Sequence, residues 1–427
     1  MSEDKERRDF LKAATAAFTT QIFTGNLKGA NDKYHTAVIG MGRMGRSNLG
    51  LAMKQDNVAV THVCDVYKPH LEQAVDMTQG KAKGVRDFRE ILADKSVDIV
   101  CISTPDHWHP YMTVEACKAG KDVYVEKPIC VVVEEGRKMV EAARKYKRVV
   151  QAGTMQRSGT HFQQATDMVR SGKLGKVTMV HTWNIGLTAE EGIGNPPDTD
   201  PPAGLDWDMW LGPAPKRPFN ANRFGVDPNA FSHFRWFWDY AGGMMTDWGV
   251  HWLDIVQMAF SEATPTAINC VAGKFRLKDN RETPDTIHAS YEYPGFCATY
   301  ENRYGNEQSM FGKNGGILFH GDLGTLFVDR SEYRVIPEKR SELREEVVKS
   351  SNNANMAHWQ NFLECVRTRQ TPISDIEKCF KSTSTCLLAN VALRSKLRLD
   401  WDGETVKQHE ARKYLTREYR KPWKLTV

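Results

Sequence analysis

The sequence lacks the cysteine patterns that mark a metal site or a disulfide framework. Its nine cysteines are scattered, no two of them form a Cys-x-x-Cys pair, and several lie within predicted core strands. We therefore expect free, buried thiols, and we predict no metal site. Internal repeats and low-complexity tracts are also absent. Beyond the N-terminal segment no apolar run is long enough to cross a bilayer, so we predict no membrane span.

The chain also lacks a large excess of positive or negative charge. The net charge is +5 over 427 residues, and the basic residues are dispersed, so a nucleic-acid partner is not expected. The contents of 41% hydrophobic and 26% charged residues are ordinary for a globular protein. The length allows two or three domains.

The N-terminus resembles a twin-arginine export signal. Arg7 and Arg8 precede Phe10 and Leu11, and a mildly apolar stretch rich in Ala and Thr follows. Glu6 replaces the usual Ser or Thr, and no clean Ala-x-Ala cleavage site follows. The alternative is a short amphipathic helix. The signal interpretation assigns residues 1–33 to a leader and arm and predicts a periplasmic or otherwise exported protein; without it, the protein would be cytoplasmic.

A glycine-rich motif follows the first β-rich run, which covers residues 36–39. Gly40, Gly42 and Gly45 form G-x-G-x-x-G between a predicted strand and a predicted helix. In such a motif the first glycine permits a tight turn, the second lets the backbone approach a pyrophosphate, and the third allows close helix–strand packing. The helix N-terminus then faces the negative charge. The variable positions Arg43 and Met44 belong to the same predicted cofactor site.

The next predicted strand ends in Asp65, twenty residues beyond Gly45. An acidic residue at this place binds the adenosine ribose hydroxyls of a dinucleotide, and its charge repels a 2′-phosphate. NAD is therefore favoured over NADP, although Lys68 nearby keeps NADP as an alternative. A strand end that simply reaches solvent is the other interpretation of Asp65.

Strands and helices alternate through residues 34–154, which predicts a doubly wound parallel sheet. Ligands bind such sheets at the carboxyl ends of the strands. Two segments, 103–109 and 126–128, lie at predicted carboxyl ends. They contribute the remaining predicted cofactor-binding residues, which are Thr104, Pro105, His109, Glu126 and Lys127.

Three motifs together are similar to those of the glucose–fructose oxidoreductase, inositol dehydrogenase and MocA (Gfo/Idh/MocA) family. They are the G-x-G-x-x-G, then Thr-Pro-x-x-x-His, then Ala-Gly-Lys-x-Val-x-x-Glu-Lys-Pro, and the resemblance extends from about residue 34 over nearly the whole chain. It implies an N-terminal Rossmann domain and a C-terminal α/β domain, here residues 155–427, with a large, mainly antiparallel open sheet. It also implies homodimers or homotetramers.

Residues 242–255 have the pattern of a helix on which Asp247 and His251 share one face. By itself, this stretch could equally be a packing helix with solvated polar residues. The family resemblance implies instead that Lys127, Asp247 and His251 form the catalytic set. His251 would take the hydroxyl proton because an imidazole titrates near neutrality, Lys127 would stabilise charge on the reacting oxygen, and Asp247 would bind a neighbouring hydroxyl. Lys127 or a relay could be the base instead.

Six of the eleven tryptophans fall between residues 207 and 252. Most must serve packing, but aromatic rings also stack on sugars, so a few are expected to line a carbohydrate pocket. The Gly- and Pro-rich residues 186–207 are predicted to be a long loop over that pocket. The predicted substrate-binding residues are Arg157, Trp236, Tyr240, Asp247 and His251.

These observations favour an NAD-dependent oxidoreductase that acts on a sugar or glycoside. A glycoside hydrolase that uses NAD for transient oxidation and elimination is the alternative, and a non-catalytic sensor is disfavoured by the intact catalytic set. An exported enzyme would lack a free pool of NAD, so the cofactor is expected to be tightly bound and regenerated in place.

Overall fold

The computed structural model describes residues 33–225 and 232–427, and residues 34–427 form one compact unit. The predicted export signal therefore lies outside the described residues. Within the described ranges, no helix has the length and apolar character needed to cross a membrane. The same ranges contain no group of three or more His, Cys, Asp or Glu side chains placed to hold a metal ion.

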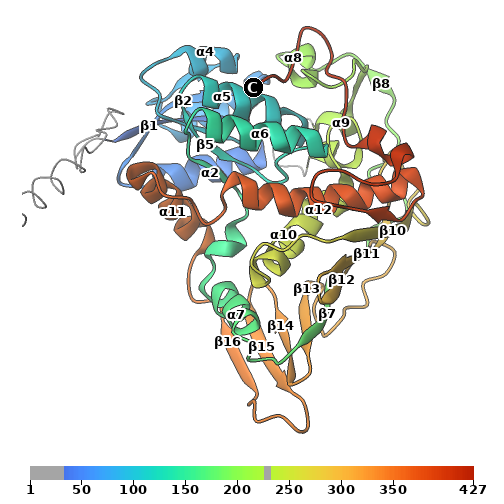
Figure 1. Ribbon diagram of the computed structural model, residues 1–427. Helices are drawn as coiled ribbons and strands as arrows, with labels where there is room; N and C mark the ends of the chain where they lie inside the picture. Colours follow the sequence, from blue (N-terminus) through green and yellow to red (C-terminus); the bar gives the residue numbers. More distant parts are fainter. Residues whose placement is uncertain (1–32, 226–231) are drawn as a thin grey trace, which may run out of the picture. The chain divides into compact units, whose positions relative to one another are not determined.

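The first sheet has six parallel strands in the order β3-β2-β1-β4-β5-β6, with helices on its faces (Figure 1). This is the strand order of a Rossmann fold, so the predicted doubly wound sheet is confirmed. The strands are Tyr34–Ile39, Val58–Cys64, Lys83–Val85, Ile99–Ile102, Asp122–Val125 and Val150–Ala152, and the connecting helices α2 to α6 are Arg43–Met53, Lys68–Met77, Phe88–Ala93, His109–Lys118 and Val133–Lys145.

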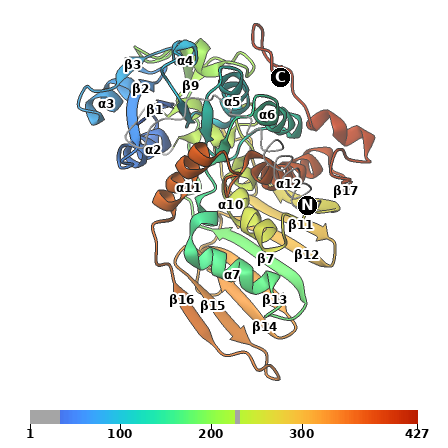
Figure 2. The same cartoon turned by 60° about the vertical axis from the view of Figure 1, so that its left-hand side comes forward.

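The central strands of this sheet are apolar because both of their faces are covered. All four residues of β4 and all four of β5 are buried. Part of the cover is α11 (Ala354–Thr368), which packs beside α2 (Figure 2). Its Trp359 stacks on Tyr124 of β5, with ring centroids 4.8 Å apart. A helix from the end of the chain thus completes the core of the N-terminal sheet.

The second sheet has nine strands in the order β16-β15-β14-β13-β7-β12-β11-β10-β17. Only the β7–β12 pair is parallel, which confirms the large, mainly antiparallel sheet. In chain order the strands are Val177–Ile185, Ala267–Gly273, Thr286–Tyr293, Phe296–Arg303, Gly315–Gly321, Gly324–Val328, Glu332–Pro337, Glu346–Lys349 and Leu399–Asp400.

The periodicity of the sequence predicts five strands in this part of the chain, and they correspond to β10 to β14. The predicted ranges are near 265–277, 283–293, 296–304, 315–320 and 323–329. The central strand β7 was not predicted. Its last four residues are all buried, so it does not show the alternation of a strand with one solvated face.

Two helices connect the sheets and position the site. The predicted helix at 242–255 is α10 (Gly243–Ala259). The sequence also predicts a late helix at 376–394, which corresponds to α12 (Ile376–Ser395). In Figure 1, α12 runs between the Rossmann helices and the second sheet, and it packs against α10, α6 and β10. This buried helix holds α10 in place against the second sheet.

Candidate active site

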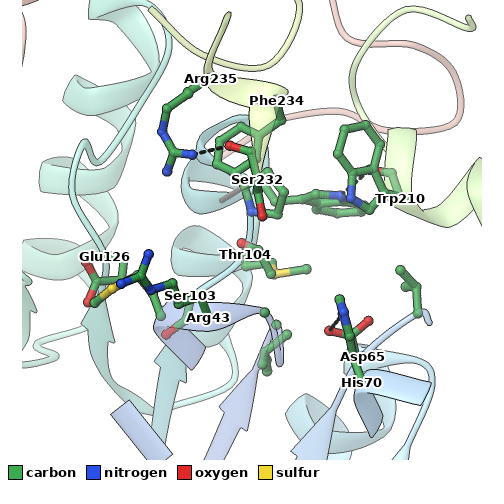
Figure 3. A pocket seen from close by; sticks show the side chains of 18 of the residues that line it. Arg43, Asp65, His70, Ser103, Thr104, Glu126, Trp210, Ser232, Phe234 and Arg235 are labelled. Atoms are coloured by element: carbon green, nitrogen blue, oxygen red, sulfur yellow. Dashed lines mark hydrogen bonds and ion pairs between the residues drawn. The ribbon is translucent and has the colours of Figure 1, made fainter. Parts of the chain in front are cut away.

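A cavity of about 420 Å³ lies at the carboxyl ends of the strands of the first sheet. Its lining also includes residues of α8 (Trp207–Leu211), η3 (His233–Trp236) and α10. Figure 3 shows Asp65 and His70 together at one end of the cavity and Glu126 at the other. The sequence-predicted residues that line it are Gly40, Gly42, Arg43, Met44, Asp65, Thr104, Pro105, Glu126, Lys127, Asp247 and His251.

The glycine motif has the geometry that a dinucleotide site requires. Gly40 has φ +87°, and a Cβ on it would lie 2.8 Å from the backbone of Ser103. A Cβ on Gly45 would lie 1.7 Å from the carbonyl oxygen of Gly40, so only glycine allows this helix to approach the strand. A Cβ on Gly42, by contrast, would meet nothing within 4 Å. The backbone at Gly42 is thus open toward the cavity at the N-terminus of α2, where a pyrophosphate fits.

Asp65 is held at one end of the cavity by backbone donors. Its Oδ2 accepts from the Met41 N–H at 2.6 Å, and its Oδ1 accepts from the Tyr67 N–H at 2.8 Å. Lys68, the residue that kept NADP as an alternative, does not line the cavity and pairs with Glu72 on α3. The carboxylate is therefore an acidic group that the ribose of a dinucleotide would meet here.

We expect Asp65→Ala to narrow the difference in affinity between NAD and NADP by about tenfold, because the variant removes a charge that repels the 2′-phosphate. Fluorescence titration of both cofactors measures the effect. Asp65→Asn removes the charge but keeps the acceptor oxygen, and Asp76→Ala on the exposed face of α3 is the matched control. Tighter binding of NADP than of NAD to the unmodified protein would contradict the assignment.

Lys127 and Asp247 form the ion pair at the other end of the cavity. The Lys127 ammonium donates to Asp247 Oδ1 at 2.7 Å and to the Asp247 carbonyl oxygen at 3.1 Å. Arg235 Nε lies 3.6 Å from Asp247 Oδ2. Burial alone would raise the pKa of Asp247, but Lys127 and Arg235 outweigh it and hold that pKa below its usual value. Asp247 is therefore an ionised carboxylate between two cations.

His251 lies one turn after Asp247 on α10 and also lines the cavity. Its Nδ1 has no hydrogen-bond partner within the described part of the chain. Burial, and then the charges of Lys127 and Arg330, hold its pKa well below 6.5. The expectation that this imidazole titrates near neutrality is therefore wrong: it is neutral there, with a lone pair available to accept a proton.

Glu126 directly follows β5, next to Lys127, and is buried. Its Oε1 accepts from Asn48 Nδ2 at 2.8 Å, and burial raises its pKa. The carboxyl group also closely approaches Gly153, on which a Cβ would lie 2.9 Å from Glu126 Oε2. This side chain ties β5 to α2 beneath the cavity.

Three predicted substrate residues do not line the cavity, so the structure corrects their placement. Arg157 is 1% exposed and pairs with Asp254 and Glu262 at 2.8 and 2.6 Å. Trp236 is buried against the Arg281 guanidinium, and Tyr240 is fully buried. The charge of Arg157 is paired inside the protein, and the two aromatic rings pack in the core. The sequence pattern alone could not distinguish these roles from a place in a pocket lining.

His109, a predicted cofactor residue, is also buried outside the lining. Its Nδ1 and Nε2 lie 2.7 Å from the carbonyl oxygens of Pro128 and Thr104. Burial lowers its pKa to about 4, although the contacts with the two carbonyl oxygens act in the opposite direction. His109 thus connects the two segments that carry the site and is a positioning residue.

The long loop at 186–207 forms no part of the cavity lining, contrary to the sequence-based expectation. The segment just after it does, through Met209 and Trp210 of α8. The end of the loop is held near α3 by a backbone hydrogen bond, in which the Lys68 N–H donates to the Gly204 carbonyl at 3.1 Å. Other lining residues that the sequence analysis missed are His70, Arg86, Ser103, Trp248, Arg235 and Arg330. Arg235 lies in a segment marked by its aromatic residues, and Arg330 directly follows the predicted strand at 323–329.

Two family models match nearly all of the chain from residue 34. The model described as an oxidoreductase family with an NAD-binding Rossmann fold matches residues 34–154. The model described as the C-terminal alpha/beta domain of an oxidoreductase family matches residues 159–425.

Curated relatives match over different lengths. An inositol 2-dehydrogenase of Salmonella typhimurium is 33% identical over 146 residues, 34% of this chain and 44% of the relative. A scyllo-inositol 2-dehydrogenase (NAD(+)) of Bacillus subtilis is 25% identical over 359 residues, 80% of this chain and 89% of the relative. A glycosyl hydrolase family 109 protein of Shewanella baltica is 31% identical over 204 residues, 40% of this chain and 44% of the relative. The chain thus spans less than half the length of the first and third.

Among solved structures, the WlbA dehydrogenase of Bordetella pertussis in complex with NADH and UDP-GlcNAcA has a TM-score of 0.64. The similarity covers 86% of this chain and 99% of that chain at 18% sequence identity. A likeness at this identity supports the shared fold.

Proposed function

Because the chain belongs to the Gfo/Idh/MocA oxidoreductase family, we propose that it transfers a hydride between a hydroxyl-bearing carbon of a sugar or glycoside and the nicotinamide of NAD. The observation that carries this proposal is the Lys127–Asp247 pair, which lies with His251 in the same cavity as the open backbone of Gly42. The relatives named as inositol dehydrogenases support a polyhydroxylated substrate. A non-catalytic sensor would not require this constellation.

The chain's own residues supply binding and proton chemistry, while a bound NAD would supply the hydride acceptor or donor. The Lys127 ammonium can hold the reacting oxygen and stabilise negative charge on it. Asp247 holds that ammonium in place at 2.7 Å and has a second oxygen that faces Arg235. His251 accepts the hydroxyl proton on its neutral imidazole. The nearby cations oppose a lasting imidazolium, so the proton must pass onward from His251.

The proposal is tested by incubating the purified protein with NAD and a panel of aldoses, inositols and aryl glycosides. NADH formation and aglycone release are followed together. NADH formation without aglycone release supports the oxidoreductase. A panel in which no member changes the redox state of the cofactor or releases an aglycone would count against it.

A second candidate is a hydrolase that oxidises a glycoside transiently, eliminates the aglycone and then reduces the product. It is favoured by the similarity to the glycosyl hydrolase family 109 protein, which is partial. The same assay separates the two functions, because the hydrolase releases aglycone without net accumulation of NADH.

We also propose that NAD is held tightly, and that the protein is exported with it. The cavity wall is fastened by the C-terminal tail, since Arg420 Nε donates to the Gly212 carbonyl at 2.9 Å, just after α8. Trp423 packs on the lining residue Trp108, with ring centroids 4.9 Å apart. These contacts favour slow release of a bound dinucleotide. The export proposal itself rests on the sequence pattern of residues 7–12.

Protein purified without added nucleotide should therefore release NAD in nearly stoichiometric amount when it is denatured, because the fastened wall slows dissociation. Chromatography of the supernatant measures the released nucleotide. Trp423→Ala should lower the amount of NAD that is recovered. The control is Lys145→Ala, which changes an exposed lysine of α6. A cofactor-free preparation that needs millimolar NAD for activity would contradict tight binding.

For assembly, we propose a homodimer or homotetramer formed through the second sheet. Large apolar side chains are exposed in and beside its strands, among them Val271 and Phe275, which are 66% and 73% exposed. Light scattering coupled to size-exclusion chromatography measures the assembly, and a monomer at working concentration would contradict it.

A further inference from the structure

Three cations converge on one ionised carboxylate at the catalytic end of the cavity. Three cationic side chains line the cavity and act electrostatically on Asp247, and they are Lys127, Arg235 and Arg330. Asp247 engages two of them directly, Lys127 at 2.7 Å and Arg235 at 3.6 Å. Among the described residues, Asp247 thus faces more cations than one carboxylate can neutralise.

Among the described residues, Asp106 near this cluster does not supply a full negative charge at neutral pH. Burial raises the pKa of Asp106 to about 8, in spite of the charges of Arg235 and Lys127, so most of this carboxyl is protonated at pH 7. Glu126, directly before Lys127, is buried against Asn48, and burial raises its pKa.

Arg330 is the cation of the three that is available to a ligand. It follows β14, and its guanidinium lies over the indole of Trp248, 4.6 Å from the ring centroid. Its Nε donates to Gln156 Oε1 at 3.0 Å, which fixes the orientation of the planar group. Within residues 33–225 and 232–427, no carboxylate lies within ion-pair distance of it, and the side chain is exposed at the cavity. An oriented guanidinium with free terminal N–H groups suits a carboxylate, which it can bind through two parallel hydrogen bonds.

We propose that the substrate is an anionic sugar, a uronate, whose carboxylate binds Arg330 while one of its hydroxyls meets Lys127 and His251. This rests on the proposed function and deepens it, since it names the class of sugar. An uncharged sugar would leave the Arg330 guanidinium without an ionic partner among the described residues. A carboxylate in place of the primary alcohol pairs with Arg330 and is attracted by Arg235 and Lys127.

The test is a binding measurement, so it does not depend on turnover. Protein loaded with NADH is titrated with D-glucuronate, D-galacturonate and D-mannuronate, and with the corresponding uronamides and aldoses, and NADH fluorescence or calorimetry reports binding. At least one uronate should bind about tenfold or more tightly than its uncharged counterparts, as expected for a charge-assisted hydrogen bond. The preference should shrink as salt is added.

Arg330→Gln should abolish the preference for the uronate over its uncharged counterparts, and NADH titration shows whether the cofactor site is intact. The matched control is Arg340→Gln, an exposed arginine outside the cavity lining, which should keep the preference. Uronates that bind no better than their amides, or a preference that survives in Arg330→Gln, would overturn the inference. If a neutral sugar reduces NAD while no uronate is preferred, the inference fails and the oxidoreductase stands. If a uronate binds through Arg330 but no sugar changes the redox state of the cofactor, the proposed function fails instead.

Discussion

Lys127→Ala should lower kcat/KM by about two orders of magnitude or more, because it removes the cation that stabilises charge on the reacting oxygen. The loss should be larger than deletion of a binding contact alone would produce. Asp247 would keep Arg235 at 3.6 Å but would lose the ammonium at 2.7 Å. The variant thus changes both the oxygen-binding group and the charge balance of the site.

Steady-state kinetics with the substrate found in the panel assay measures this loss, and NADH titration shows whether the cofactor site is intact. Lys145→Ala, which changes an exposed lysine of α6, should behave as the unmodified protein. Lys127→Arg keeps the charge with a different shape, and partial activity in it would show that charge alone supplies part of the effect. Near-normal turnover in Lys127→Ala would rule out the assigned role.

His251→Ala should also reduce kcat/KM by about two orders of magnitude, the effect typical for loss of a proton-transfer group. Cofactor binding should survive, because His251 lies on α10, whereas the glycine motif lies between β1 and α2. Chemical rescue by added imidazole is a suitable second measurement. If His251→Ala keeps the kcat/KM of the unmodified protein, then Lys127 or a relay is the base instead.

The pH profile of the unmodified protein should show how strongly the site perturbs His251. Its folded pKa lies well below 6.5, so protonation, and the accompanying loss of rate, should occur only well below pH 6.5. The sign is the same for stability: the unfolded imidazole binds a proton first as the pH falls, so the contribution of the neutral buried ring is present above pH 6.5 and is lost below it. A midpoint at pH 6.5 that disappears in His251→Ala would contradict the perturbed environment.

Local patterns were sufficient for much of the fold. The alternation of strands and helices around Gly40, Gly42 and Gly45 determines a Rossmann sheet, because glycine is required wherever the backbone must approach closely. The spacing of Asp247 and His251 places both on one face of a helix. The strand β7 escaped prediction, because a strand buried on both faces loses the period of two on which such predictions rest.

Charge and aromatic character did not reveal where a side chain would point. Arg157 and Tyr240 were predicted to face a substrate, and both are buried, the arginine in a double ion pair. Arg330 was missed, and it lines the cavity. A buried arginine and a ligand-binding arginine have the same local sequence signal, since the partner that distinguishes them comes from a distant part of the chain.

The sequence by itself determined the dinucleotide motif, the acidic residue at the end of β2 and the helix that carries Asp247 and His251, because each depends on residues within one turn or one strand–helix unit. Only the tertiary structure decided that Lys127 meets Asp247 across 120 residues of sequence, that α11 completes the first sheet and that His251 is neutral. The physical reason is that ion pairing, core packing and desolvation depend on which distant surfaces are brought together, and no local pattern encodes that.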